Sequence, residues 1–453
     1  MRGPGRILLV SCYEQGHAPH GLALPKAFLE RAGFAPRAVD LAIERLPEAA
    51  VDDAGLIAIS VPMHTALRLG VDLARRILAR RPRARVGFFG HYAVLNRAFL
   101  DRLGAAFVLG GECEQALVEL VEAADVGADG EAVTARVELR KLSFPRPSRA
   151  GLPAPAGYAR LDTGAGAGRV IGYTETTRGC LDTCRHCPIP VVYGGRLFAI
   201  DAEVVLADVA AQVEAGAGHI TFGDPDFFNG PSHGMRVLRS MHQRWPALSF
   251  DITAQVTHLL RHRRYLDELV ELGCAFVVSA IESVSDGVLA ALGKRHRRAE
   301  VERLLDACAD AGLVLRPTFV TFTPWTSRAD LRDLVELVVG RGLVDHVDPV
   351  QLTIRLLVPP GSLLLQAHPD RFGALDEAAF THAWRHPDPV MDGLQAELAA
   401  LVADAAERDQ DPGVTFAALR DSIYARAFPE TTPPPLPTLV RRRVPRVTEP
   451  WFC

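Results

Sequence analysis

One stretch decides the fold and the chemistry of this 453-residue chain: Arg178-Gly179-Cys180-Leu181-Asp182-Thr183-Cys184-Arg185-His186-Cys187-Pro188. Three of the eight cysteines of the chain lie here, with the spacing C-x3-C-x2-C. Structural zinc sites normally use paired C-x2-C units or cysteine with histidine, whereas thiolate sulfur is the ligand that iron–sulfur clusters select. The spacing therefore indicates a [4Fe–4S] cluster that is held by three thiolates and keeps its fourth iron open.

Cys180, Cys184 and Cys187 match the signature of the radical SAM enzymes, with His186 where an aromatic ring usually precedes the third cysteine. The resemblance implies that the amine and carboxylate of S-adenosylmethionine (SAM) bind the open iron. It also implies that one-electron reduction cleaves the sulfonium to a 5′-deoxyadenosyl radical. The alternatives are a zinc site with His186 as fourth ligand and three unrelated core cysteines.

The composition is that of a globular protein of several domains, with 48% apolar and 23% charged residues. A net charge of −4 with mixed signs predicts no polyanion-binding field, so nucleic acid is not an expected partner. The apolar run 7–10 is too short for a signal peptide, and no run of about 18 apolar residues predicts a membrane span. Eight cysteines in this length do not indicate a disulfide scaffold, so we expect a cytoplasmic, reducing setting.

Residues 1–125 alternate short apolar strands with helices. Strands are expected at 6–11, 35–40, 56–61, 86–90 and 106–110, and helices at 22–32, 67–80 and 112–124. This alternation predicts a parallel, doubly wound, Rossmann-like sheet. In such sheets a ligand lies beyond the carboxyl ends of the strands, here in the loops 12–20, 62–66, 91–96 and 111–115.

A domain of this kind just before a radical SAM motif resembles the cobalamin-binding domain of the B12-dependent radical SAM class. The matching segments are Gly21-Leu22-Ala23, Ser60-Val61-Pro62-Met63-His64-Thr65, Gly90-His91-Tyr92-Ala93 and Gly110-Gly111-Glu112-Cys113-Glu114. The cobalamin contacts that the resemblance implies are Ser60, His64, Thr65, Gly90, His91, Tyr92, Gly111 and Glu112. The D-x-H-x-x-G motif is absent, because Gln15 stands two residues before His17, so no histidine–cobalt bond is expected. The alternative is a Rossmann-like domain without the cofactor, in which these are ordinary turn residues.

Residues 126–168 contain several prolines and glycines and are expected to form a linker. From 169 to 358 the alternation resumes, with strands expected at 170–176, 219–222, 248–254, 275–281, 314–322 and 349–356. Helices are expected within 197–214, 233–244, 259–272, 299–311 and 328–339. Six such units predict a partial (β/α)6 barrel, with the cysteine loop at the carboxyl end of its first strand, where active sites of such barrels lie.

Other loops of the barrel carry groups suited to SAM. Gly223, Asp224 and Asp226 stand where the superfamily has a Gly-Gly-Glu-like segment; carbonyls and an acid match the three donors of the SAM ammonium. A surface turn is the alternative.

Glu282 and Ser283 resemble the I-E-S segment that meets the SAM ribose; for Glu282, a charge at a helix start is the alternative. Thr253 and Gln255 line either the SAM or substrate cavity or the barrel core. Arg297 is a candidate partner of the SAM carboxylate, although the basic run 294–298 is more typical of a solvated helix start.

Residues 359–453 are expected to be a separate, mostly helical region, with helices at 394–407 and 416–428. Its last residues are Thr448-Glu449-Pro450-Trp451-Phe452-Cys453, which resemble the tails of the CUAEP/CCAEP-tail radical SAM (seleno)proteins. The resemblance implies that the natural chain continues through a selenocysteine codon and that Cys453 acts as a methyl or selenium carrier or as a redox partner. A natural terminus is the alternative.

The sequence thus predicts a cobalamin-dependent radical SAM enzyme that methylates an unactivated carbon of a small-molecule or peptide substrate. Its electron donor is expected to be a flavodoxin or ferredoxin. The alternatives are a radical rearrangement, selenium or sulfur chemistry, and a non-catalytic cobalamin or metal carrier. Methylthiotransfer to tRNA is disfavoured, since the sequence has neither an extra N-terminal cysteine trio nor a basic β-rich C-terminal module.

Overall fold

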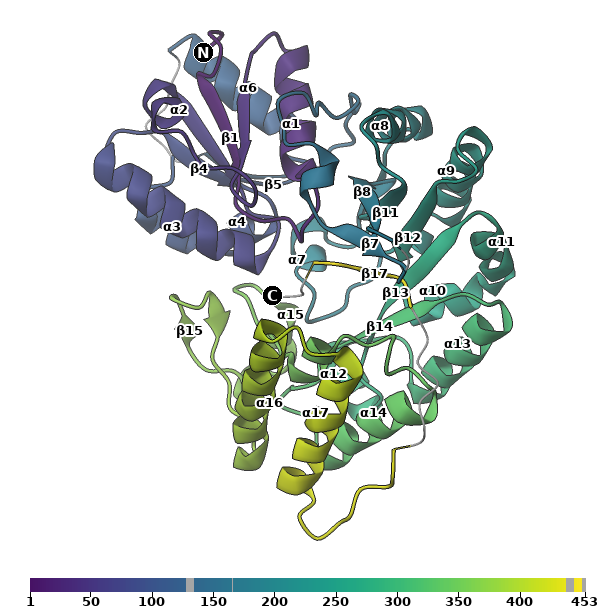
Figure 1. Cartoon of the computed structure of the whole chain (residues 1–453). Helices are drawn as coiled ribbons and strands as arrows, with labels where there is room; N and C mark the ends of the chain where they lie inside the picture. Colours follow the sequence, from purple (N-terminus) through teal and green to yellow (C-terminus); the bar gives the residue numbers. More distant parts are fainter. Residues whose placement is uncertain (128–133, 165, 437–443, 450–453) are drawn as a thin grey trace.

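The computed structural model describes residues 1–127, 134–164, 166–436 and 444–449. Two sheets of mainly parallel strands and a helical C-terminal region make up the molecule (Figure 1), which confirms the predicted α/β fold class. Within those ranges, each helix is too short or too polar to cross a bilayer.

The N-terminal sheet has six parallel strands in the order β2-β1-β3-β4-β5-β6. They are β1 Ile7–Ser11, β2 Arg37–Asp40, β3 Leu56–Ser60, β4 Val86–Phe89, β5 Phe107–Gly111 and β6 Thr134–Glu138. The helices are α1 His20–Arg31, α2 Glu48–Asp53, α3 His64–Arg80, α4 His91–Leu95, α5 Arg97–Leu103 and α6 Glu114–Asp125. Ile7 and Leu9 pack into one core with α1 and α6, whereas Leu8 and Val10 pack into another with α2 and α3. Helices therefore cover both faces, as the continuous apolar strands predict.

The predicted linker contributes a strand to each sheet. Strand β6 pairs parallel with β5, and β7 Arg160–Asp162 pairs antiparallel with β8 of the second sheet. The β6 sequence Thr-Ala-Arg-Val-Glu alternates with charged side chains, which suits an edge strand with one wet side.

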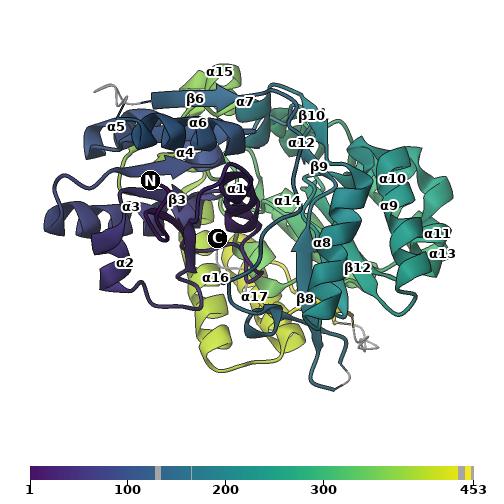
Figure 2. The same cartoon turned by 90° about the horizontal axis from the view of Figure 1, so that it is seen from above.

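The second sheet forms the partial barrel, in the order β14-β13-β12-β11-β8-β7-β17. Its strands are β8 Arg169–Thr174, β11 His219–Phe222, β12 Ser249–Thr253, β13 Cys274–Glu282, β14 Leu315–Phe319 and the short β17 Arg446–Val447. The main crossover helices are α8 Ala202–Glu214, α9 Pro231–Arg244, α10 Val256–Arg261, α11 Leu266–Glu271, α13 Arg298–Asp310 and α14 Arg328–Gly340. Figure 2 shows α9, α10, α11 and α13 on the side of this sheet that faces away from the N-terminal sheet.

The predicted sixth barrel strand at 349–356 was wrong. A 3-10 helix, η4 Pro349–Thr353, takes its place, and a single parallel bridge from Phe322 to Arg355 remains. Pro349 fixes the first helical position, and Gln351 Oε1 accepts a hydrogen bond of 3.0 Å from the Phe319 backbone. The apolar run therefore packs as a 3-10 helix against the outer side of β14 and does not add a full strand to the sheet.

The C-terminal helices α16 Pro389–Glu407 and α17 Pro412–Ala427 confirm the two predicted there, and α17 packs on α14. Between barrel and helices, the short hairpin of β15 Leu375–Asp376 and β16 Thr381–His382 reaches back to the N-terminal sheet. Its Phe380, at φ 53°, packs edge-on against Phe99 with ring centroids 4.9 Å apart. The remaining elements are β9 Thr177–Gly179, β10 Leu197–Ala199, α7 Ile189–Tyr193, α12 Asp286–Leu292, α15 Leu363–Ala367 and the 3-10 helices η1 Pro155–Gly157, η2 Phe227–Asn229, η3 Arg263–Tyr265 and η5 Pro369–Arg371.

Candidate functional site

The cysteine loop follows β9 at the carboxyl end of the barrel sheet. Cys180 and Cys184 are buried, and the Nδ2 of Asn229 donates to the Cys180 Sγ at 3.3 Å. Burial raises the pKa of Cys184 to about 11 and that of Cys187 to about 12, and the neighbouring thiols add to the rise at Cys187. Burial and mutual proximity therefore keep these thiols protonated. A bound metal would have the opposite effect, because a metal ion deprotonates its thiol ligands.

A buried ion pair lies beside the cysteine loop. Glu282, at φ 66° on the end of β13, places its Oε1 at 3.2 Å from His186 Nε2 and 3.5 Å from Lys294 Nζ. Burial alone would raise the pKa of Glu282, but Lys294 and His186 outweigh it and lower that pKa to about 2. The site therefore holds an ionised carboxylate and a cation next to the thiols.

Lys294 was not predicted, whereas Arg297 of the same basic run was. Arg297 is exposed at the start of α13, where its backbone N–H donates to the Oε2 of Glu300 at 3.0 Å. The structure does not bring Arg297 to the cysteine loop. Within the run, only the tertiary fold distinguishes the buried side chain of Lys294 from those of the exposed Arg295 and Arg297.

Asp224 is saturated by hydrogen bonds from the strand that leads to the cysteines. The backbone N–H and the hydroxyl of both Thr176 and Thr177 donate to its carboxylate at 2.6 to 2.9 Å. A carboxylate has about four acceptor positions, and all of them are used. Asp224 therefore fixes the start of β9, and an ammonium at this loop would depend on backbone carbonyls.

Asp226 belongs to a second hydrogen-bonded group under the loop. Its Oδ2 lies 2.7 Å from His258 Nδ1, and Gln255 Nε2 donates to the Oδ2 of Asp182 at 2.9 Å. Ligand atoms of Asp182, Asp226 and His258 lie within 4.8 Å of one another, close enough to hold a metal ion. These side chains also satisfy one another's hydrogen-bonding groups, so the group positions Asp182 within the cysteine loop.

Ser283, predicted at the SAM ribose, is buried, and its Oγ accepts a hydrogen bond from the Ser285 N–H at 3.1 Å.

A cavity of about 230 Å³ opens inside the barrel next to these loops; we call it the barrel cavity. It is lined by Tyr13, Gln15, Gly16, His17, Ala159, Ile171, Tyr173, Thr221, Phe222, Gly223, Asp224, Pro225, Asp251, Thr253, Phe276, Val278, Val447 and Glu449. His17, from the loop after β1, stacks on Tyr173 with ring centroids 3.6 Å apart. Gly223 is required here, because a Cβ would overlap the Tyr173 ring. The predicted Thr253 and Gly223 thus line one space, which residues of the N-terminal domain and of the tail close.

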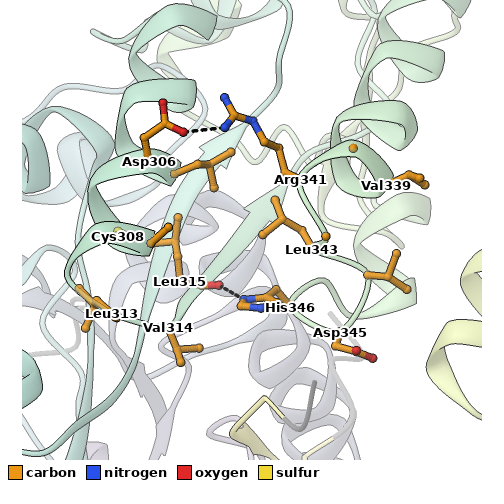
Figure 3. Close-up of a pocket in the computed structure, with 16 residues that line it drawn as sticks. Asp306, Cys308, Leu313, Val314, Leu315, Val339, Arg341, Leu343, Asp345 and His346 are labelled. Atoms are coloured by element: carbon orange, nitrogen blue, oxygen red, sulfur yellow. Dashed lines mark hydrogen bonds and ion pairs between the residues drawn. The ribbon is translucent and has the colours of Figure 1, made fainter. Parts of the chain in front are cut away.

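A second, larger cavity of about 630 Å³ lies at the opposite end of the barrel, between α13, β14 and α14 (Figure 3). Its charged side chains pair with each other, since Arg341 Nη1 lies 2.6 Å from Asp306 Oδ1. The Nδ1 of His346 lies 2.8 Å from the Leu315 carbonyl oxygen. This cavity is lined by Cys308 and lies apart from the loop of Cys180, Cys184 and Cys187.

An ion-pair cluster joins the N-terminal sheet to β9, the strand that ends directly before Cys180. Arg178 of β9 donates to Glu114 Oε1 at 2.7 Å and lies 3.5 Å from Glu112 Oε2. The Tyr193 hydroxyl donates to Glu112 Oε1 at 2.9 Å. Glu112, predicted to contact cobalamin, therefore connects the end of β5 with β9, the strand directly before Cys180.

Buried polar atoms without a hydrogen-bond partner gather along the same edge. They are Ser11 Oγ, Glu14 Oε1, both ring nitrogens of His20, His91 Nδ1 and Glu114 Oε2. Glu175 Oε2 also makes no hydrogen bond, but it lies 3.3 Å from Arg178 Nε and 3.7 Å from His20 Nε2. Burial, helped by neighbouring acids, raises the pKa of Glu14 to about 8, and burial lowers that of His91 to about 4. Unpartnered buried groups are rare and call for a partner that supplies both donors and acceptors. A corrin ring surrounded by amide side chains is such a partner, so the donor set along this edge fits cobalamin.

The other residues predicted for cobalamin lie on this carboxyl edge of the N-terminal sheet. Gly90 and Gly111 have φ of 111° and 70°, and a Cβ on Gly111 would overlap the Glu138 carbonyl. His64 Nε2 lies 2.7 Å from the Ala379 carbonyl oxygen of the β15–β16 hairpin. Ser60 and Tyr92 are buried, Thr65 is half-buried in α3, and His91 packs edge-on against Tyr193 at 5.5 Å. Cys453 lies outside the described residues, so its assignment stays a prediction.

Comparison with known proteins agrees with this geometry. Residues 174–338 match the sequence model of the radical SAM superfamily. The ribosomal protein uS12 methylthiotransferase RimO of Desulfosudis oleivorans is 26% identical over 188 residues, 39% of this chain and 41% of its own length. A proposed methylthiotransferase of Methanocaldococcus jannaschii is 23% identical over 299 residues, 62% of each chain. The match thus spans less than two thirds of the length of either relative.

Solved structures resemble the chain over a longer range. The radical S-adenosylmethionine methyltransferase TsrM from Kitasatospora setae, with cobalamin and a [4Fe–4S] cluster bound, has a TM-score of 0.61 at 17% identity, covering 93% of this chain and 88% of its own. The cobalamin-dependent radical enzyme OxsB, with aqua-cobalamin and S-adenosylmethionine bound, has a TM-score of 0.66 at 12% identity, covering 88% and 66%. At these identities the likeness is one of fold.

Proposed function

We propose that this chain, a radical SAM superfamily protein, cleaves SAM reductively at a [4Fe–4S] cluster held by Cys180, Cys184 and Cys187. The observation that carries the proposal is the gathering of these three thiols on one loop at the carboxyl end of the barrel sheet, with Cys180 and Cys184 buried. When bound, the cluster would supply one electron to the sulfonium, whose bond to C5′ breaks into methionine and a 5′-deoxyadenosyl radical.

The residues around the loop support that role by position and charge. The amide of Asn229 donates to the Cys180 sulfur, which favours the thiolate that a metal requires. Lys294 offsets negative charge next to the thiolates, and the ionised Glu282 can accept hydrogen bonds from ribose hydroxyls. Asp224 fixes the strand before Cys180, so the loop keeps its shape while ligands exchange.

We further propose that cobalamin binds along the edge where the unpartnered polar atoms lie, and that the enzyme methylates an unactivated carbon. The Rossmann-like strand order and those unpartnered atoms support it, as does the likeness of fold to TsrM and OxsB. When bound, cobalamin would supply the methyl group. The proposed role of Cys453 as a carrier is supported by the tail, since Glu449, four residues earlier, lines the barrel cavity.

The cluster is tested with a matched pair of cysteine variants. After anaerobic reconstitution, the wild type should show the brown absorbance of a [4Fe–4S] cluster and release 5′-deoxyadenosine from SAM. Cys180→Ala should lose both, whereas Cys308→Ala, which removes a buried cysteine of α13, should keep both. A Cys180→Ala protein that still cleaves SAM would overturn the proposal.

The cofactor is tested by content as well as by turnover. Reconstituted wild type should retain cobalamin through gel filtration and form S-adenosylhomocysteine as well as 5′-deoxyadenosine. His20→Ala removes a buried ring whose two nitrogens make no hydrogen bond and should lower the cobalamin content while the iron content stays the same. His346→Ala, at the far end of the barrel, is the control. Equal cobalamin in all three proteins would contradict binding at this edge.

A further inference from the structure

We propose that the barrel cavity takes a substrate with a cationic amine on a small apolar or aromatic body, and that the Glu449 carboxylate pairs with this amine. The inference deepens the proposed function, on which it rests, by naming the substrate class. Segments that are distant in the sequence close this cavity, and the charged side chains in its lining are acidic.

The tail is held in place beside the cavity by backbone pairing. Strand β17 pairs antiparallel with β7, and the N–H of Thr448 donates to the Arg160 carbonyl at 2.8 Å. The Arg160 N–H in turn donates to the Thr448 hydroxyl at 2.8 Å. Figure 1 shows β17, in yellow, lying beside β7 at the edge of the second sheet. Val447 and Glu449 therefore enter the cavity wall from a fixed strand.

Glu449 also contacts the loop that follows β1. The Tyr13 hydroxyl donates to Glu449 Oε1 at 3.0 Å, and a Cβ on Gly16 would overlap the Glu449 carboxylate. The Gly16 carbonyl accepts from the Ala159 N–H at 2.9 Å. The N-terminal domain, the segment before the barrel and the tail thus meet at one carboxylate.

The charge of the lining is negative. The carboxylates of Asp224, Asp251 and Glu449 line the cavity, and its described lining contains no lysine or arginine. His17, the one histidine of this lining, stays neutral in the physiological range, because burial lowers its pKa to about 4. A carboxylate or phosphate on the substrate would meet no cation in this lining, whereas an ammonium would be favoured.

Of the three acids, Glu449 has the most acceptor capacity to offer. Asp224 is saturated by Thr176 and Thr177. The Oδ1 of Asp251 accepts from the Thr221 hydroxyl at 2.6 Å and lies 2.8 Å from His219 Nε2. Within the part of the chain that the structure describes, Glu449 receives one hydrogen bond, from Tyr13, and its carboxylate can accept more.

The walls are apolar and aromatic, and the volume is small. Ile171 of β8 and Phe276 and Val278 of β13 line the space together with the stacked rings of His17 and Tyr173. Faces of such rings attract cations. A volume of about 230 Å³ lies below that of pockets for drug-sized ligands, so a body of about one ring is expected.

Three probes with the same ring separate the charges: phenethylamine, phenylalanine and 3-phenylpropionate. Their dissociation constants are measured by NMR titration on the reconstituted holoenzyme with SAM bound, so that the positive charge of SAM occupies its own site. Phenethylamine should bind most tightly and 3-phenylpropionate most weakly. Glu449→Gln should weaken phenethylamine about tenfold, as expected for a charged hydrogen bond at a partly exposed group, and leave 3-phenylpropionate unchanged.

Glu430→Gln makes the same charge change at an exposed position near the end of α17 and should leave all three constants unchanged. The proposal is overturned if 3-phenylpropionate binds as tightly as phenethylamine, if Glu449→Gln has no larger effect than Glu430→Gln, or if SAM abolishes the preference for the amine. Release of 5′-deoxyadenosine is measured in the same samples. An active holoenzyme with the wrong probe order refutes only this inference, whereas an inactive one refutes the proposed function.

Discussion

Lys294 Nζ lies 3.5 Å from Glu282 Oε1, with 2% of the lysine side chain and 10% of the glutamate side chain exposed. Both charged groups are largely shielded from solvent, so water cannot solvate either one if its partner is removed. The pair contributes little to stability beyond an apolar pair of the same size, but removal of one member leaves a buried charge unpaired. The arrangement therefore keeps a charge of each sign beside the thiols at all times.

Lys294→Met should lower the free energy of unfolding of the apoprotein by about 3–5 kcal/mol, since the buried Glu282 then loses the lysine charge that pairs with it. Guanidinium denaturation measures the change. Arg295→Met removes the same charge from a side chain that is 64% exposed and should cost less than about 1 kcal/mol. The double variant Glu282→Gln/Lys294→Met should recover most of the loss. Equal costs for Lys294→Met and Arg295→Met would contradict the buried pair.

Glu14→Gln should stabilise the apoprotein increasingly as the pH rises. Burial, helped by Asp40 and Glu175, raises the pKa of Glu14 from 4.5 to about 8, so the folded state binds this proton more tightly than the unfolded chain. Stability is therefore full below pH 4.5 and falls as the pH rises to about 8. The glutamine removes this penalty, for a gain on the order of 1–3 kcal/mol at pH 8 and little at pH 5.

Melting temperatures at pH 5, 6.5 and 8 measure the effect. Glu430→Gln, at an exposed site, should follow the wild type at each pH. A gain for Glu14→Gln that is the same at pH 5 and pH 8 would show that the carboxyl is ionised throughout.

Gly223→Ala should destabilise the barrel by about 1–3 kcal/mol, the usual cost of overpacking. Its new methyl group would overlap the ring of Tyr173, which His17 holds from the other side at 3.6 Å. Gly340→Ala, in α14, meets no atom within 4 Å and should be neutral or stabilising by up to about 1 kcal/mol. Urea denaturation compares the two, and the added change Tyr173→Leu should recover part of the loss at Gly223. No recovery would place the strain elsewhere.

Phe380→Ala should detach the β15–β16 hairpin from the N-terminal sheet. The ring is 4% exposed and packs on Phe99, so its removal should cost about 3–5 kcal/mol. Limited proteolysis should then cut between 368 and 388 faster than in the wild type. Val414→Ala, at a side chain that is 56% exposed, should leave the rate unchanged. An unaltered rate for Phe380→Ala would mean that the hairpin is held by other contacts, such as His64 with the Ala379 carbonyl.

Local patterns predicted much of the fold. The apolar runs of β1, β3, β4 and β5 alternate with amphipathic helices, and the spacing of the cysteines identified their loop. The run at 349–356 misled because its apolar residues suit a buried strand as well as η4, and only the packing of Gln351 under β14 decides between them. The parallel pairing of β6 with β5 was not predicted, because its charged alternation is as typical of a linker as of an edge strand.

The site was harder to predict because its residues meet only through the tertiary fold. Lys294 lies in a run of five basic residues, and nothing local marks Lys294 and His296 as the buried ones. Asp224 and Asp226 were assigned by position to the SAM ammonium, but the donors that surround them come from β9 and α10. Glu449 has no local signal, since its partners Tyr13 and Gly16 stand at the other end of the sequence.

The pairing of β17 with β7 also protects an edge of the sheet from self-association. Without β17, the outer side of β7 would expose unpaired backbone groups to any other chain, as open sheet edges do. The pair joins residues 162 and 446, so its long loop closes late in folding, after the neighbouring parallel strands have formed. During that interval a second molecule can donate its own β17, and slow refolding at high protein concentration will favour domain-swapped dimers over monomers.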